Sequence, residues 1–197
     1  HPFIENHKWL EADCIKYEHD IFYIDLTQSE SDIWKGFDKG CKSAIKKAQK
    51  NLRVFTTDKV MPSFLKLYNE TMKRDNASKG YFFNLEFYLK LNKLNPVCVE
   101  VDGLSGALMP THGDYAHYFL SGSSLEARST GAGNLVLFRL IQVARERGCK
   151  IFNLGGGAHG DDSLASFKRS FTKTSKPFYT HRKIHNQAVY NQLCQAK

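Results

Sequence analysis

A short loop of glycines beside an arginine is the part of this sequence with the clearest potential for chemistry. Arg128, Gly131 and Gly133 fit the spacing Arg-x-x-Gly-x-Gly, within a continuous segment of residues 115–157. Glycines let a backbone approach a ligand closely and aim successive N–H groups at it. A helix that begins at Gly133 or Asn134 directs its unpaired N–H groups to the same place. The pattern predicts a pyrophosphate site made of Arg128, Ser129, Gly131, Ala132, Gly133 and Asn134.

The same loop also has a purely structural interpretation. A Gly-rich turn before a helix often serves only to start that helix, and Asn134 is of a type preferred as a helix cap. The motif is also short enough to arise by chance. The elements around the loop must therefore decide between the two interpretations.

A second glycine-rich run, GGGAHG at residues 155–160, satisfies G-x-G-x-x-G between a strand and a helix. A dinucleotide site requires an acidic residue about 20 positions later, and residues 178–182 contain none. We interpret the run as the loop where a strand ends at a cleft lined by Asn153, Gly155 and Gly156. A plain flexible turn is the alternative.

Composition limits the classes of function. The chain has 197 residues and a formal net charge of +8, which favours anionic partners such as a phosphorylated cofactor, nucleic acid or an anionic lipid-linked substrate. A solvated basic surface is the alternative. Five scattered cysteines without C-x-x-C spacing favour reduced thiols over disulfides or a structural metal site, so we expect no metal. Apolar runs are too short to span a bilayer, and we expect a cytoplasmic protein.

The periodicity of apolar residues predicts an alternation of strands and helices. We expect residues 1–20 to be irregular and one helix to run from Ser29 or Ser31 to Ala48. Another helix is expected to start at Asn84, and a later one at Asp162 or Ser163. The remaining predicted strands are 21–26, 52–57, 97–101, 107–111, 115–120, 150–154 and 177–183, and the remaining predicted helices are 58–77, 135–147 and 187–195.

From residue 52 onward these elements follow the order β-α-α-β-β-β-α-β-α-β. Two hairpins precede a crossover from strand to loop, helix and strand, so the strands that flank the crossover helix should be parallel. The prediction is an α/β (α+β) fold with a mixed central sheet and helices on both faces. We expect residues 1–51 to form an N-terminal segment, possibly left from a preceding half-domain, and residues 52–197 to form the main domain.

This order, with Arg-x-x-Gly-x-Gly after the fourth strand, resembles the GNAT acyltransferase fold, and more specifically its FemAB-like branch of peptidoglycan-bridge aminoacyltransferases. The matching segments cover residues 21–171. Lys42 stands where that pattern usually has Arg, which weakens a bidentate phosphate role there. The start of the chain, His1-Pro2-Phe3 with Asn6, resembles a segment that follows an earlier half-domain, so we expect the C-terminal part of a longer protein. The segments that carry the resemblance are KSAIKKA (42–48), LYNETMKR (67–74), AHYFLSG (116–122), GAGN (131–134), NLGG (153–156) and Phe167-Lys168 with Phe171.

The resemblance implies the roles of several residues. The loop would bind the pyrophosphate of acyl-CoA, and the fourth and fifth strands would separate to admit the acyl group. Lys168 would stabilise charge at the reacting carbonyl or at a substrate phosphate, whereas the general rule for lysine predicts surface exposure. The expected substrate-binding residues are Ser121, Asn153, Gly155, Gly156 and Arg74.

Acid and base candidates are the residues whose side chains can be tuned for proton transfer, namely His117, Tyr118, Glu100, Glu70 and His159. His117 and Tyr118 lie on opposite faces of an alternating strand, so only one of them can point into a given site. Backbone N–H groups near Ser121 could stabilise a developing oxyanion.

The sequence thus predicts an N-acyltransferase with acyl-CoA, such as acetyl-CoA, or aminoacyl-tRNA as the donor. A bacterial aminoacyl-tRNA-dependent ligase that acts on a peptidoglycan or cell-envelope precursor is one alternative. A non-catalytic basic module that binds nucleic acid or an anionic surface is another. The acceptor could be a small-molecule amine or an envelope precursor.

Overall fold

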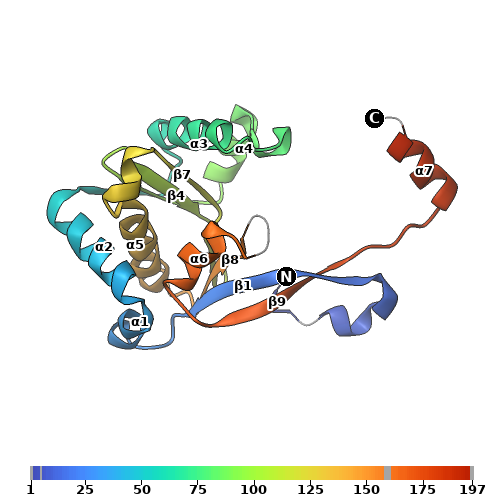
Figure 1. Ribbon diagram of the computed structural model, residues 1–197, viewed down its shortest axis with the longest axis horizontal. Coiled ribbons are helices and arrows are strands. Elements are labelled where there is room, and N and C mark those ends of the chain that lie inside the picture. Colours follow the sequence, from blue (N-terminus) through green and yellow to red (C-terminus); the bar gives the residue numbers. More distant parts are fainter. Residues whose placement is uncertain (1, 5, 158–160, 196–197) are drawn as a thin grey trace.

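Two β-sheets form the centre of the molecule, and the chain passes from one sheet to the other between β6 and β7. The structure is a computed structural model that describes residues 2–4, 6–157 and 161–195 (Figure 1). The expected mixed α/β fold is confirmed, but the predicted single sheet is divided into two, with strand orders β5-β6-β8-β1-β9 and β2-β3-β4-β7.

The four-stranded sheet is antiparallel throughout. It contains β2 (Val54–Thr57), β3 (Val97–Val101), β4 (Ser105–Met109) and β7 (Leu120–Ser123). Asp102 and Gly103 both have positive φ between β3 and β4, as a tight hairpin requires.

The five-stranded sheet contains the parallel pair that the crossover predicts. Its strands are β1 (Ile15–Asp25), β5 (Thr111–His112), β6 (Tyr115–His117), β8 (Ile151–Gly155) and β9 (Ser175–His181). β6 and β8 are parallel, and the other pairs are antiparallel. Residues 15–20 were predicted to be irregular, which is wrong: they extend β1 and pair with β9.

The sheets separate within the segment that was predicted to be one strand, residues 115–120. The Tyr118 N–H donates to the Asn153 carbonyl of β8 at 2.9 Å, and the next N–H, of Phe119, donates to the Leu108 carbonyl of β4 at 3.0 Å. Consecutive amides therefore bond to different sheets, and β6 and β7 diverge at this point. We call the region between β7 and β8, where the two sheets separate, the fork.

Helices cover both faces of the four-stranded sheet. α3 (Pro62–Arg74) and α4 (Leu85–Asn92) pack on one face, and α5 (Ala132–Glu146) packs on the other (Figure 1). Cys98 and Leu108 point toward α3, whereas Val97, Val99 and Val101 join the larger core with α5. The alternation of strand side chains produces these two cores.

The predicted long helix at residues 29–48 is two helices. α1 (Glu30–Gly36) is capped by Ser29, whose Oγ accepts from the Asp32 N–H, and α2 (Lys39–Asn51) follows. The break lies at Phe37 and Asp38, both with extended backbone. Phe37 is buried against Trp34, Phe138 and Phe171, so tertiary packing interrupts a pattern that looked continuous.

The C-terminal region reaches away from the body. α6 (Ser163–Arg169) packs beside β1, whereas α7 (Gln187–Gln195) stands at the end of an extended arm with no buried residue (Figure 1). Within the described residues, no helix has the length and apolar character needed to cross a membrane. Since β1 of residues 1–51 pairs with β8 and β9, the two expected segments share one sheet.

Candidate active site

A buried lysine occupies the fork. Asp162 caps α6 by accepting from the Ala165 N–H at 2.9 Å, and this short helix carries Lys168 inward, where the residue is only 6% exposed. Its Nζ donates to the Gly156 carbonyl at 2.6 Å and lies 5.9 Å from the centre of the Tyr118 ring. The expected surface exposure of a lysine therefore does not apply to Lys168.

Burial changes the acidity of this ammonium. Desolvation lowers the pKa of Lys168 to about 8, while the Asp162 carboxylate acts in the opposite direction. The Lys168 ammonium donates one hydrogen bond, to Gly156, and lies beside the Tyr118 ring. It therefore has N–H groups left to donate to an anionic or carbonyl oxygen. The side chain is thus suited to stabilise developing negative charge.

Tyr118 and Ser121 form the other side of the fork. Burial raises the pKa of Tyr118, against a smaller lowering by its hydrogen bond with Ser121, so the phenol keeps its proton near neutral pH. At the end of β7, the Ser123 N–H and carbonyl both face away from β4, because they bond to Thr71. Antiparallel ladders alternate, so the N–H and carbonyl of Ser121 face the same free edge.

Two glycines allow β8 to end beside the lysine. Gly155 has φ of +71°, and a Cβ built on it would lie 3.3 Å from Lys168 Nζ. A Cβ on Gly156 would lie 2.1 Å from His19 Cδ2 and 2.7 Å from the Asp20 carbonyl oxygen. Gly155, which ends β8, thus lies close to Lys168, and Gly156 after it fits against β1 only because it lacks a side chain.

His117 and Asn153 face the opposite side of the sheet. They are paired in register, and Asn153 Nδ2 lies 3.2 Å from His117 Nδ1. The Asn153 Oδ1 accepts from the Gly155 N–H, so its amide nitrogen is the donor to His117. Burial lowers the pKa of His117. Because Tyr118 packs toward the core shared with α5, the structure groups it with Lys168 and separates both from His117.

The other acid, base and substrate candidates lie away from Lys168. Glu100 is buried on the α3 face of β3, which β4 separates from β7, and its Oε2 has no hydrogen-bond partner among the described residues. Glu70 is exposed on α3, and His159 lies outside the described residues. Arg74 donates to the Ser123 carbonyl at 2.7 Å and pairs with Asp75.

The residue of the Arg-x-x-Gly-x-Gly loop that caps α5 differs from the predicted one. Gly131, with φ of +79°, is the N-cap, whereas Asn134 lies within the helix and its side chain contacts Cys41 Sγ at 3.6 Å. The cap predictions of Asn134 and Gly133 are therefore wrong. A Cβ on Gly131 would lie 2.5 Å from the Ala44 carbonyl oxygen, so only glycine lets α2 approach the loop this closely.

The loop has features that fit a phosphate group. The Ala132 N–H is satisfied by Thr130 Oγ1 at 3.1 Å, but no acceptor is recorded in the described structure for the N–H groups of Gly131, Gly133 or Asn134. Gly131 is the N-cap of a 15-residue helix, and Gly133 and Asn134 lie in its first turn. Arg128 and Ser129 are exposed beside them, and the Lys47 ammonium contacts the Ser129 carbonyl at 2.9 Å.

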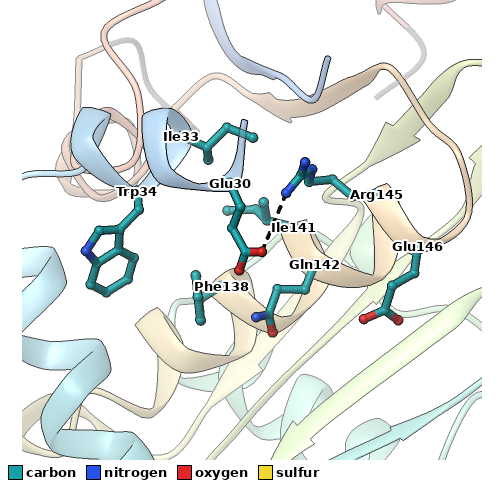
Figure 2. Close-up of a pocket in the computed structure, with 8 residues that line it drawn as sticks. All are labelled: Glu30, Ile33, Trp34, Phe138, Ile141, Gln142, Arg145 and Glu146. Carbon is teal, nitrogen blue, oxygen red and sulfur yellow. Dashed lines mark ion pairs between the residues drawn. The ribbon is translucent and has the colours of Figure 1, made fainter. Parts of the chain in front are cut away.

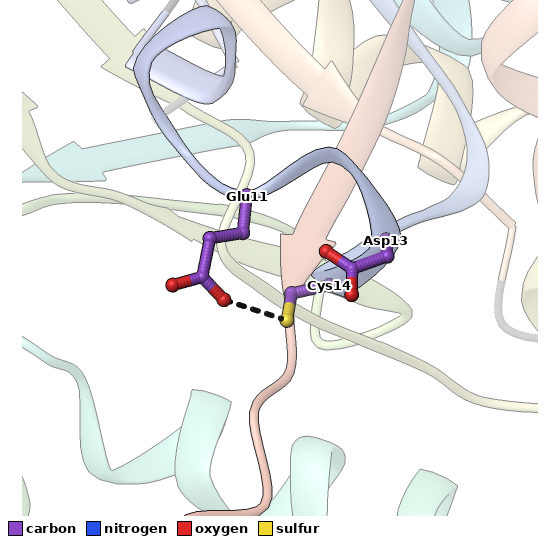
Figure 3. A group of neighbouring side chains, drawn as sticks. All are labelled: Glu11, Asp13 and Cys14. Carbon is purple, nitrogen blue, oxygen red and sulfur yellow. Dashed lines mark hydrogen bonds between the residues drawn. The ribbon is translucent and has the colours of Figure 1, made fainter.

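Two other features lie apart from the fork. A pocket between α1 and α5 is crossed by the Glu30–Arg145 ion pair at 3.8 Å, and none of the fork residues lines it (Figure 2). In the described part of the chain, one cluster groups three possible metal ligands, Glu11, Asp13 and Cys14 (Figure 3). Its Glu11 carboxylate already binds Lys183 Nζ at 2.6 Å, and the cluster gives no reason to assign a metal.

The structure thus brings together only part of the predicted set. Lys168, Tyr118, Ser121, Gly155 and Gly156 meet at the fork, whereas Asn153 borders it from the other face. Sequence reasoning missed Thr71 and Lys47 as residues that shape the site. The only signal for Thr71 was a polar residue on the apolar stripe of a helix.

Comparisons with known proteins agree with this geometry. Residues 35–169 match the family described as acetyltransferase (GNAT) domain. FemX shares the fold with a TM-score of 0.64 at 15% identity, over 96% of this chain and 70% of FemX. L-PGS from Bacillus licheniformis gives 0.65 at 15% identity, over 98% of this chain and 69% of that protein.

A third structure belongs to the same group. The C-terminal domain (DUF2156) of a candidate lysylphosphatidylglycerol synthetase from Agrobacterium fabrum gives a TM-score of 0.64 at 15% identity, over 93% of this chain and 66% of that one. Likeness at this identity shows a common fold. No curated protein matches the chain.

Proposed function

The chain belongs to the acetyltransferase (GNAT) domain family, and from this premise we propose that it transfers an acyl group to an amine at the fork. The observation that carries the proposal is the buried Lys168, held at the Gly156 carbonyl beside Tyr118 where the sheets separate. Acyl transfer is accelerated by hydrogen-bond donors or positive charge aimed at the carbonyl oxygen, where negative charge develops, and the buried Lys168 ammonium is a donor of this kind.

Each residue of the fork has a separate role in the proposed acyl transfer. The acceptor nitrogen forms a bond to the donor carbonyl carbon, and the bond from that carbon to the leaving group breaks. Lys168 and the Ser121 N–H stabilise the negative charge that develops on the carbonyl oxygen. Tyr118, protonated near neutral pH because burial raises its pKa, gives a proton to the leaving group, and the acceptor releases its own proton to solvent or a base.

Acyl-CoA is the first candidate donor, because the α5 loop fits a pyrophosphate. Gly131, Gly133 and Asn134 would hold it by their N–H groups, with Arg128 and Lys47 nearby. The donor when bound supplies a thioester, whose carbonyl is readily attacked. Equilibrium binding of CoA that is lost in Arg128→Ala, which leaves the packing of Gly131 against Ala44 intact, supports this donor.

An aminoacyl ester carried by RNA is the second candidate, favoured by one contact. Thr71 and Arg74 already bond to the N–H and carbonyl of Ser123, so the free edge of β7 is occupied there. The amide-bearing arm of CoA could not pair with β7 at Ser123, because the N–H and carbonyl of Ser123 are already hydrogen-bonded to Thr71 and Arg74. Binding of deacylated tRNA together with no affinity for CoA would favour this second donor.

Transfer assays with each donor test the role of Lys168. Lys168→Met should lower kcat/KM by about 10²- to 10³-fold, the effect typical of losing one oxyanion donor. The matched control is Lys173→Met, since Lys173 is exposed and pairs with Asp38. Equal activity in the wild type and Lys168→Met would contradict the proposal.

A further inference from the structure

His117 and Asn153 form a polar pair where β6 ends, on the face of the five-stranded sheet opposite to Lys168. His117 is the last residue of β6, and its register partner on the parallel strand β8 is Asn153. Tyr118, the next residue, points to the other face and lies beside Lys168. His117 is therefore placed at the fork, on the side opposite to the groups that stabilise charge.

The main chain of β8 fixes the orientation of the Asn153 amide. The Gly155 N–H donates to Asn153 Oδ1 at 2.9 Å, so the amide nitrogen Nδ2 is the atom that lies 3.2 Å from His117 Nδ1. An amide nitrogen donates and does not accept, so His117 Nδ1 must be the acceptor. A neutral imidazole carries one N–H, and the proton of His117 therefore lies on Nε2.

The same contact opposes protonation of His117. An imidazolium carries a proton on both ring nitrogens, so its Nδ1–H would point at the donor nitrogen of Asn153. Turning the amide over would present Oδ1 to His117, but it would set Nδ2 against the Gly155 N–H. Charging the ring thus breaks one of the two hydrogen bonds in either case. Burial acts in the same direction and lowers the pKa of His117.

The surroundings of His117 on this face are largely aromatic. Phe3 stacks on Tyr115 at 5.6 Å and packs edge-on against Tyr23 at 5.1 Å. Asp25 accepts hydrogen bonds from the N–H and the hydroxyl of Thr27. A neutral ring costs less desolvation than a charged one in such a setting. The other titratable side chains on this face are His112 on β5, Tyr115 on β6, His19, Tyr23 and Asp25 on β1, and Lys176 on β9.

We propose that His117 is a neutral hydrogen-bond donor of the fork: Asn153 holds its proton on Nε2, and this N–H binds an oxygen of the acceptor substrate. Gly155 connects the pair to the reacting groups, because it orients Asn153 and a Cβ built on it would lie 3.3 Å from Lys168 Nζ. A ring held in this state does not take the proton of the attacking amine, since Nδ1 is occupied and Nε2 already carries a proton. Asn153 is a positioning residue, and the binding role of His117 rests on the proposed function.

Two-bond ¹H–¹⁵N correlation spectra of the chain labelled with ¹⁵N-histidine test the tautomer. The signal of His117 is assigned by its loss in His117→Gln, and at pH 7 it should show a neutral ring protonated on Nε2. Asn153→Asp offers a carboxylate that accepts from Nδ1–H, so the titration midpoint of His117 should rise by at least about one pH unit. Asn191→Asp makes the same change at an exposed site on α7 and should leave that midpoint unchanged. A ring protonated on Nδ1, an imidazolium at pH 7, or an unchanged midpoint in Asn153→Asp would overturn the inference.

Steady-state transfer separates binding from proton transfer at His117. Glutamine can donate an N–H from a similar place but cannot act as a base, whereas alanine can do neither. His117→Ala should lower kcat/KM for the acceptor by about 10-fold or more, and His117→Gln should recover most of this loss. Donor affinity should be unchanged in both variants, which also shows that they fold.

Two results of the transfer assay would overturn the role of His117 alone. These are equal losses of about 10²- to 10⁴-fold in both variants, which identify a general base, and full activity of His117→Ala. Absence of transfer by the wild type would overturn the proposed function and, with it, the binding role. The spectra report the tautomer without any turnover, so the two failures remain distinguishable.

Discussion

Lys168 combines a positive charge with a buried position, and its protonation should govern activity. The ammonium is present below a pKa of about 8 and is lost above it. We expect kcat/KM to fall as pH rises through about 8, because neutral Lys168 cannot stabilise an oxyanion. A pH–rate profile of the wild type and of Lys168→Arg makes the comparison, since an arginine stays charged and should remove this limb. A limb at the same pH in an active Lys168→Arg enzyme would assign the titration to another group.

The same burial should appear in the stability of the fold. The pKa of Lys168 is lowered from 10.5 to about 8 by folding, so between these values the unfolded chain holds the proton that the folded chain has released. Stability then rises with pH through this window, and the charged side chain is a cost below pH 8. The full shift corresponds to about 3 kcal/mol.

Urea unfolding at several pH values measures this effect. The unfolding free energy of the wild type minus that of Lys168→Met should increase by about 3 kcal/mol from pH 8 to pH 10.5. Lys173→Met provides the control, because its exposed side chain should leave the pH dependence unchanged. A flat difference would mean that Lys168 is not desolvated in the folded protein.

At the scale of elements, the contact between α2 and the α5 loop depends on one glycine. Gly131 and Gly148 have nearly equal φ, +79° and +77°, but a Cβ on Gly131 meets the Ala44 carbonyl oxygen at 2.5 Å and one on Gly148 meets nothing within 4 Å. Gly131→Ala should therefore destabilise the protein by about 1–3 kcal/mol more than Gly148→Ala. Thermal or urea unfolding of the two variants measures the difference, and equal losses would exclude close packing at Gly131.

The regular elements were predictable where local signals agreed. Ser29, Asn84 and Asp162 cap their helices as predicted, Pro62 opens α3, and α7 has the predicted bounds. The parallel pairing of β6 and β8 followed from connection rules alone. Each of these features depends on residues that are close in sequence or on general topology.

The features that were missed depend on distant contacts. The break at Phe37 results from aromatic packing with residues on α5 and after α6, and the fork arises because Tyr118 and Phe119 bond to different sheets. Gly131 rather than Asn134 caps α5, since the approach of α2 selects a residue without a side chain. Likewise, the burial of Lys168 could not follow from sequence, because α6 and β8 create it together.

For the whole molecule, the two-sheet arrangement separates the candidate residues into different environments. The fork gathers Lys168, Tyr118 and Ser121, and the α5 loop packs against α2. His117 and Asn153 lie across the sheet. A donor should therefore contact the region from the α5 loop to the end of β8, and the pocket between α1 and α5 should remain empty.

Hydrogen exchange of the wild-type chain, alone and with acetyl-CoA or aminoacylated tRNA, tests this central claim most directly. With its true donor, peptides that cover residues 118–123 and 155–157 should exchange more slowly, because the Ser121 N–H and the glycine backbone become hydrogen-bonded or shielded. Peptides that cover residues 30–34, beside the pocket of Figure 2, should be unchanged. Protection confined to that pocket, or no protection of residues 118–123 with either donor, would contradict acyl transfer at the fork.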